Sequence, residues 1–220
     1  MALLPPLEPA WKTGDEPFVA QDGSAAGFDL RSFWAWAMSD LMTNTGRGVL
    51  AEFLVAKALG LARSPRLDFE PYDLTTEDGI KVEVKASAYL QSWFQRRLSR
   101  IVFSIRPSIS WSGFTNAWGT EWQIHADVYV FCLLAHSDKL TVDPLRLDQW
   151  QFYVLDANVI RERMAGRKSI SLTELHALGL QPVPYAELAD AVRAAASRVA
   201  SAPIGTVPLH EGADSTLAIP

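Results

Sequence analysis

Apolar and polar residues alternate strictly between positions 80 and 87, which is the period of a half-buried β-strand. The apolar side chains of this stretch are expected to face a core. The polar side chains then share the opposite face: Lys81, Glu83, Lys85 and Ser87. On a strand of standard rise, Glu83 and Lys85 lie about 7 Å apart along that face. The pattern therefore predicts an acidic and a basic side chain side by side on a sheet.

A second alternating stretch, at residues 67–74, precedes this strand, and an Asp-Gly pair between the two is a turn signal, so a β-hairpin is predicted. Loop length decides the chemistry, because a register slip of one residue moves every side chain to the other face. A three-residue loop over 77–79, whose glycine takes the left-handed conformation, sets Asp73 opposite Glu83. A two-residue turn would instead set Asp73 opposite Val84 and separate the carboxylates.

An amphipathic helix is predicted upstream, between residues 48 and 60. Its apolar residues recur close to the spacing of one helical face: Leu50, Phe53, Leu54, Ala58 and Leu61. Residues that favour helix N-termini stand ahead of it: Thr43, Asn44 and Thr45. Glu52 lies at the margin of the apolar face, where a carboxylate needs a partner. A second metal ion or a metal-bound water is one candidate for that partner.

Two carboxylates side by side repel each other unless a cation or a proton lies between them. Mg²⁺ prefers oxygen ligands, and proteins usually hold it with one or two carboxylates plus waters and substrate phosphate oxygens. Asp73 and Glu83 suit such an ion. Lys85 cannot ligate a metal while it is charged, but it can hold the scissile phosphate, stabilise transition-state charge or orient the attacking water.

Each of these signals also has a simpler structural interpretation. Alternating charges at positions 81–85 are typical of the solvated face of an edge strand. Asp73 suits a strand end that approaches a turn, and Glu52 suits an exposed helix position. The spacing of Asp and Glu-x-Lys is loose and arises by chance in many proteins. Their order, a helix with Glu, a strand with Asp, a tight turn and a strand with Glu-x-Lys, favours the functional interpretation.

In this order the residues resemble the PD-(D/E)xK nuclease superfamily, which has the restriction-endonuclease-like fold. The resemblance covers roughly residues 46–135 and rests on three segments: Arg47-Gly48-x3-Glu52, Pro71-Tyr72-Asp73 and Glu83-Val84-Lys85. Tyr72 separates Pro71 from Asp73, whereas the superfamily motif places Pro next to Asp. Because that Pro carries no chemistry, the departure changes little.

The resemblance implies a Mg²⁺ site, with Mn²⁺ as a substitute, in which Asp73 and Glu83 bind the ion and Glu52 completes the ligand set. It gives Lys85 the activation or positioning of water. Gln91 stands where several superfamily members have a polar helper, although an ordinary loop amide is the alternative. The implied fold is α/β, with a mixed central sheet flanked by helices and, in this chain, additional C-terminal helices.

Two further groups suit nucleic-acid binding. Arg96, Arg97 and Arg100 form the densest basic cluster of the chain and could hold backbone phosphates, although a solvated helix face explains them equally well. Four aromatic residues could stack on bases, with core or lid packing as the alternative: Trp111, Phe114, Trp118 and Trp122.

The 220-residue chain is long enough for a single-domain core, and its composition of 49% hydrophobic and 20% charged residues is globular. A net charge of -5 argues against a protein that coats nucleic acid generally, but not against a nuclease with a local cationic groove. The single Cys132 excludes an internal disulfide, and the apolar run at 126–135 is too short to span a bilayer. With no secretory pattern at the N-terminus, these features predict a cytoplasmic protein without membrane association.

Residues 1–27 are rich in Pro, Gly and acidic residues and predict a partly irregular N-terminal arm, while residues 201–220 predict a tail. The nuclease-like domain is expected over residues 28–200. Its further elements are expected as follows: a helix at 30–42 capped by Asp29, strands at 101–105, 127–134 and 152–155, a helix opened by a capping box at Ser171, and a helix at 185–200 that packs on the sheet or forms a dimer surface.

The leading hypothesis is a Mg²⁺-dependent nuclease that hydrolyses DNA phosphodiester bonds with a metal-activated water. RNA as substrate, exonucleolytic cutting and a homodimer stay open at this stage. The alternative is a catalytically silent restriction-endonuclease-like module for binding or assembly. A small-molecule hydrolase has less support, since no Ser or Cys nucleophile has a convincing base nearby in the sequence.

Overall fold

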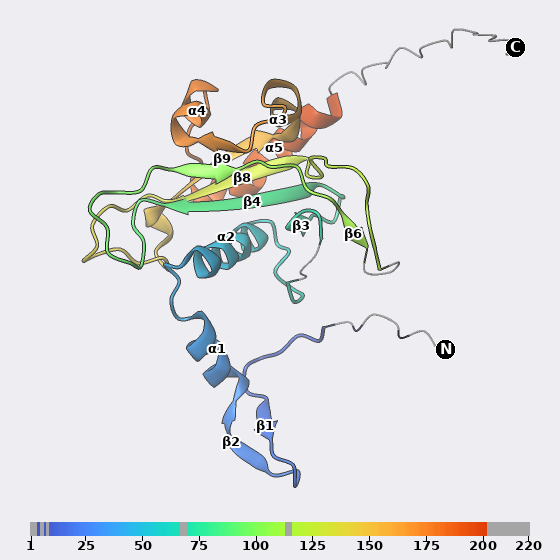
Figure 1. Cartoon of the computed structure of the whole chain (residues 1–220), viewed down its shortest axis with the longest axis vertical. Coiled ribbons are helices and arrows are strands. Elements are labelled where there is room, and N and C mark those ends of the chain that lie inside the picture. The colour runs from blue at the N-terminus through green and yellow to red at the C-terminus, as the bar shows by residue number, and fades with distance from the viewer. Residues whose placement is uncertain (1–3, 5–6, 8, 67–69, 113–115, 202–220) are drawn as a thin grey trace, which may run out of the picture.

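A four-stranded mixed β-sheet forms the centre of the molecule (Figure 1). The computed structural model describes residues 4, 7, 9–66, 70–112 and 116–201. The sheet has the order β3-β4-β8-β9, with these bounds: β3 Leu74–Thr75, β4 Lys81–Ala88, β8 Val128–Leu134 and β9 Trp150–Asp156. β4 and β8 are parallel, whereas the two outer pairs are antiparallel. The prediction of an α/β protein with a mixed central sheet flanked by helices is confirmed.

Two helices cover one face of the sheet: α2 (Asn44–Ala58) and α5 (Leu188–Ser201). α2 packs along β4, and α5 packs along β9. Their inner faces and alternate strand positions form one core: Ala51, Leu54, Val55, Val82, Val84, Val128, Val130, Cys132, Leu134, Phe152, Val154, Leu188, Val192 and Ala195. Of the two alternatives left open for the C-terminal helix, its apolar face therefore packs on the sheet.

A second core lies on the opposite face. It is covered by two helices and a two-stranded ribbon: α3 (Ala157–Arg163), α4 (Leu172–Ala177), β5 (Val102–Ser104) and β10 (Ser169–Ser171). β8 is consequently buried along its whole length, as its unbroken apolar sequence predicts. The strand expected at 101–105 exists, but it pairs with β10 and not with a strand of the central sheet. Its alternate residues Ile101, Phe103 and Ile105 pack down onto the sheet instead.

Side-chain caps fix the helix starts that the sequence indicates. Thr43 accepts a backbone N–H at 3.0 Å at the start of α2. Ser171 and Glu174 form the reciprocal capping box of α4. Asp29 accepts a backbone N–H at 2.8 Å at the start of α1 (Leu30–Met38). Each cap satisfies a donor that the first turn of a helix leaves without an intrahelical partner.

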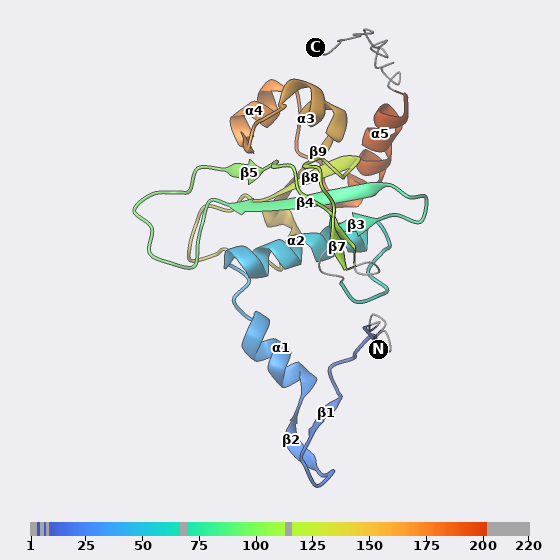
Figure 2. The same ribbon diagram turned by 45° about the vertical axis from the view of Figure 1, so that its right-hand side comes forward.

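The N-terminal part of the chain lies apart from the sheet (Figures 1 and 2). A hairpin of β1 (Pro17–Val19) and β2 (Ala25–Asp29) leads into α1, and we call residues 13–38 the N-terminal appendage. The arm expected to be partly irregular thus contains an ordered hairpin. α1 ends at Met38, before the predicted end at residue 42, and none of its residues is buried. Within the described part of the chain, the large apolar side chains of this helix, Phe33, Trp34, Trp36 and Met38, are exposed.

The other elements are short. β6 (Trp111–Ser112) and β7 (Ala117–Trp118) form a small hairpin, and the 3-10 turns η1 (Leu147–Gln149) and η2 (Tyr185–Glu187) precede β9 and α5. Three predicted features fall partly or wholly outside the described residues: the strand start at 67–69, Phe114 and the tail from residue 202. Among the helices that the structure describes, none has the length and apolar character needed to cross a membrane.

Candidate active site

The β3–β4 hairpin has the register that brings two carboxylates together. Leu74 pairs with Val82, and the Thr76 N–H donates to the Ile80 carbonyl at 3.0 Å, so the paired positions enclose a three-residue loop over 77–79. The loop ends on Gly79, whose φ of +86° is the left-handed conformation that such a loop requires. Asp73 is the residue before β3, and its N–H donates to the Val82 carbonyl at 3.1 Å, which brings its carboxylate within electrostatic reach of Glu83. The predicted loop length is therefore confirmed.

Asp73 stands just before β3, at the point where strand pairing with β4 stops. Its carboxylate accepts the Val84 N–H at 2.7 Å, so a side-chain oxygen takes the place of a strand carbonyl. Burial, together with the charges of Glu83 and Glu52, raises the pKa of Asp73 to about 6. The ammonium of Lys85 and the hydrogen bond from Val84 act in the opposite direction without cancelling this effect. The site therefore carries more negative charge than its own cations offset.

Glu83 and Lys85 form an ion pair on one face of β4, with 17% and 29% of their side chains exposed. Burial works against the charge of Lys85, but Glu83 and Asp73 outweigh it and hold the pKa of the ammonium above its usual value. Lys85 is therefore a charged donor next to the carboxylates, in the place that the sequence predicts for it.

Tyr129 is a neighbour of the site that the sequence pattern did not indicate. It pairs with Glu83 between the parallel strands β4 and β8, so the two side chains lie on the same face of the sheet. Burial and the negative charge of Glu83 raise the pKa of the Tyr129 phenol far above its usual value. The phenol therefore keeps its proton at neutral pH. In the sequence Tyr129 lies within a continuous apolar run, so only the folded structure shows that it is next to Glu83.

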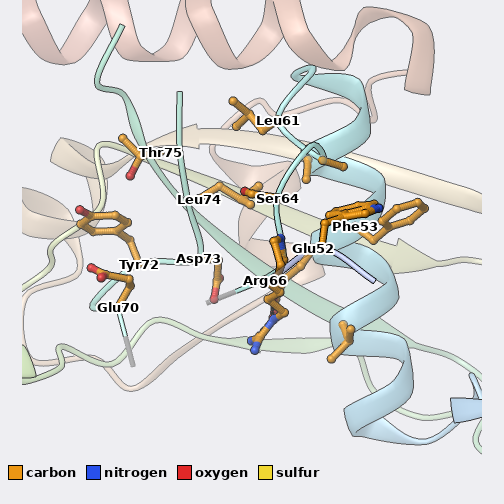
Figure 3. Close-up of a pocket in the computed structure, with 15 residues that line it drawn as sticks. Glu52, Phe53, Leu61, Ser64, Arg66, Glu70, Tyr72, Asp73, Leu74 and Thr75 are labelled. Atoms are coloured by element: carbon orange, nitrogen blue, oxygen red, sulfur yellow. Dashed lines mark hydrogen bonds and ion pairs between the residues drawn. The ribbon is translucent and has the colours of Figure 1, made fainter. Parts of the chain in front are cut away.

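Glu52 reaches the site from α2, and its partner is Arg66 (Figure 3). The guanidinium engages both carboxylate oxygens: Nη2 donates to Oε1 at 3.2 Å, and Nε donates to Oε2. The Glu52 side chain is 14% exposed and that of Arg66 is 41% exposed. No sequence signal pointed to Arg66, because it lies in the loop after α2, outside any periodic pattern.

A cavity of about 530 Å³ opens beside these groups (Figure 3). Its charged lining consists of Glu52, Arg66, Glu70 and Asp73. The rest of its lining is mainly apolar and aromatic and includes Phe53, Leu61, Pro65, Tyr72 and Leu74. Glu83 and Lys85 are not part of the lining. The cavity therefore reaches Asp73 and Glu52 but not the ion pair of Glu83 and Lys85.

The carboxylates at this place suit a divalent cation, for which they would supply only some of the ligands. Asp73 lies close to Glu83 and Glu52, and burial together with these charges raises its pKa although Lys85 pairs with Glu83. In the described ranges, no three His, Cys, Asp or Glu side chains gather closely enough to hold a metal by themselves. Glu52 lies within electrostatic reach of Asp73, but Arg66 engages its oxygens. Two carboxylates completed by waters and phosphate oxygens are a common arrangement for Mg²⁺.

Gln91 lies beyond the C-terminal end of β4 and is buried. Its side-chain amide donates to the Ala88 carbonyl at 3.1 Å and accepts from Arg47 Nη1 at 3.4 Å. Arg47, also buried, donates to the Asn44 side chain at 2.7 Å at the start of α2. Gln91 thus ties α2 to the end of β4, and it does not line the cavity beside Asp73.

The groups predicted to contact nucleic acid lie on exposed segments. Arg96, Arg97 and Arg100 are exposed on the loop that follows the C-terminal end of β4. Trp118 and Trp122 are 69% and 70% exposed, so core packing does not account for these two residues.

The protein-family model described as Bacteriophage T4 endonuclease IV matches residues 35–174, which is more than half of the chain. The matched stretch begins within α1 and ends within α4. It contains the five residues predicted to be catalytic, Glu52, Asp73, Glu83, Lys85 and Gln91, and it excludes both the N-terminal hairpin and α5. No curated protein matches the chain.

Proposed function

Since the chain belongs to the bacteriophage T4 endonuclease IV family, we propose that it is an endonuclease that hydrolyses phosphodiester bonds of DNA with the help of Mg²⁺ or Mn²⁺. Family membership supports the nuclease activity. The metal dependence, and a site of the PD-(D/E)xK type, rest on one observation: the β3–β4 hairpin brings the carboxylates of Asp73 and Glu83 within electrostatic reach of each other beside Lys85.

Asp73 and Glu83 would hold the divalent cation, and Glu52 would serve as a third ligand. A bound ion would lower the pKa of a coordinated water and offset the charge of the scissile phosphate. The donor set favours this assignment, because the pKa of Asp73 is raised to about 6 by burial and by its acidic neighbours. A cation between the carboxylates would relieve that repulsion and lower the pKa of Asp73.

Lys85 provides a positive charge on the same face of β4 as Glu83. Its ammonium would donate to a non-bridging phosphate oxygen or to the attacking water, and so reduce the negative charge that develops in the transition state. The Tyr129 phenol keeps its proton, so it adds no further negative charge next to Glu83.

Arg96, Arg97 and Arg100 would hold backbone phosphates of a substrate that extends past the C-terminal end of β4, with salt-dependent affinity. Gln91 would act as a positioning residue, since its amide donates to Ser99 Oγ at 3.3 Å within the same loop. A homodimer would present two sites to the two strands of a duplex.

The test is incubation of the purified chain with plasmid, linear duplex and single-stranded DNA, with and without Mg²⁺ or Mn²⁺. Cutting is expected only with the metal, and Lys85→Ala is expected to lower its rate about a hundredfold or more. Lys81→Ala is the matched control, because Lys81 lies on the same face of β4 with its ammonium 5.6 Å from the Tyr72 ring centroid. No cutting of any substrate by the unmodified chain would favour the catalytically silent module.

A further inference from the structure

We propose that Arg66 is a functional residue of this site, which neutralises Glu52 in the metal-free protein and turns to a phosphate oxygen of the substrate when a divalent cation takes Glu52. This inference rests on the proposed function, because it assumes that a divalent cation binds beside Asp73.

Competition between Arg66 and the cation follows from the contacts of Glu52. The guanidinium engages both oxygens of this carboxylate, Oε1 through Nη2 and Oε2 through Nε. A guanidinium and a divalent cation repel each other, so placing both on one carboxylate is unfavourable. Binding of the cation to Glu52 must therefore weaken or break at least one contact with Arg66.

The exposure of the two partners decides which of them moves. Glu52, 14% exposed and anchored in the middle of α2, would be left as a poorly solvated charge without a partner. Arg66, 41% exposed in a loop, keeps its guanidinium in contact with water, so reorienting it costs less. Exchange of partners therefore moves the arginine and leaves the carboxylate in place.

The cavity determines where the guanidinium can go. Arg66 and Asp73 line the same cavity (Figure 3). A guanidinium binds phosphate in the same two-pronged geometry as carboxylate, so a phosphate next to Asp73 is a suitable new partner. Lys85 does not line the cavity, and Arg66 would supply a second cation from the side that Lys85 does not occupy.

A purely structural role makes a different prediction. If Arg66 only anchors the loop after α2 to the helix, its removal should lower the melting temperature and leave metal affinity unchanged. If it competes with the cation, its removal should increase metal affinity. These two effects are measured separately, so the roles can be distinguished.

The experiment uses the full chain with Arg66→Ala, Arg66→Lys and, as the matched control, Arg63→Ala, which removes the same charge from an exposed position of the same loop. Calorimetric titration with Mn²⁺ in the absence of DNA is the first readout. Arg66→Ala is expected to bind Mn²⁺ about 3- to 10-fold more tightly, since the competing cation is gone. Arg63→Ala is expected to stay within about twofold of the unmodified chain, because its charge lies in water.

The second readout is the affinity for a DNA oligonucleotide in Ca²⁺, measured by fluorescence anisotropy. Arg66→Ala is expected to bind about tenfold more weakly, since a charged phosphate contact is lost. Arg66→Lys keeps the charge without the fork, so it should give Mn²⁺ affinity near that of the unmodified chain and intermediate DNA affinity. This variant also serves if Arg66→Ala does not fold.

Unchanged or weaker Mn²⁺ binding by Arg66→Ala, with an unmodified chain that does bind Mn²⁺, would overturn the role of Arg66 alone. An unmodified chain that binds neither Mn²⁺ nor Mg²⁺ would overturn the proposed function as well.

Discussion

The β3–β4 hairpin and the β1–β2 hairpin are built by the same local rules but have different surroundings. Each has a glycine with positive φ in its connection, Gly79 at +86° and Gly23 at +84°. β4 lies inside the sheet, with α2 on one face and β8 at its side. In the N-terminal hairpin, the ring centroids of Phe18 and Phe28 are 4.7 Å apart, yet both side chains are substantially exposed.

This difference in surroundings changes the properties of the acidic side chains on the two hairpins. In β3–β4 the sheet holds Asp73 close to Glu83, and burial, together with the charge of Glu83, raises the pKa of Asp73 to about 6. Asp22 in the β1–β2 connection is also acidic, but it is exposed, and hydrogen bonds from Ser24 lower its pKa. An acidic side chain on a hairpin becomes a candidate ligand only when packing prevents water from solvating it.

Removing one carboxylate from each hairpin should give the largest difference between the two regions, measured as the rate of DNA cutting. Glu83→Gln is expected to lower the rate of metal-dependent DNA cutting by about a hundredfold or more, because a ligand and its charge are lost together. Asp22→Asn is the matched change in the other hairpin and should leave the rate unchanged. Equal rates for the two variants would remove Glu83 from the site.

Truncating one phenylalanine in the central sheet and one in the N-terminal hairpin should give different losses of stability. Phe131→Ala, at a fully buried position of β8, is expected to lower the free energy of unfolding by about 3–5 kcal/mol. Phe28→Ala, on the exposed hairpin, is expected to cost about 1 kcal/mol or less. Urea denaturation measures both values. A loss of similar size for Phe28→Ala would mean that the N-terminal appendage is packed against something in solution.

The titration of Asp73 gives a pH-dependent prediction. Its pKa is about 6 in the folded protein against an ordinary value of 3.8, so the folded protein binds this proton more tightly than the unfolded chain does. Without metal, the contribution of Asp73 to stability is therefore greatest below about pH 4 and is lost as the pH rises through about 6. Asp73→Asn should consequently stabilise the metal-free protein at pH 7.5 by on the order of 2 kcal/mol and have little effect near pH 4.

Thermal unfolding of Asp73→Asn and of the unmodified chain at pH 7.5 and pH 4 checks the direction of this stability change. Destabilisation at pH 7.5 would mean that the carboxylate is favourably paired in the metal-free state. The pKa would then lie below its ordinary value.

The smallest expected effect belongs to α1. Trp36 is 84% exposed, so Trp36→Ala should change the free energy of unfolding by less than about 0.5 kcal/mol. A larger loss, or a lower particle mass for the variant in sedimentation, would show that a second copy covers this helix.

The features that were predictable from the sequence depend on neighbouring residues. The turn residues and the alternation around β4 are local, and they were sufficient for the loop length and for the pairing of β3 with β4. The buried strand β8 follows from its own apolar run.

The features that were not predictable depend on distant parts of the chain. β5 pairs with β10, which lies far along the sequence, and an apolar stripe on α1 predicts a helix without saying what covers it. Arg66 meets Glu52 only after the loop folds back onto α2. Tyr129 is brought next to Glu83 only by the parallel pairing of β4 and β8.

The most direct test of the central claim, that Asp73 and Glu83 form a divalent-cation site, is thermal unfolding with and without millimolar Mg²⁺ or Mn²⁺. The unmodified chain should gain several degrees with metal, because an ion that binds only the folded state stabilises it by mass action. Asp73→Asn and Glu83→Gln should gain nothing, while Asp22→Asn should respond like the unmodified chain. Equal stabilisation of all four proteins, or none in the unmodified chain, would contradict the claim.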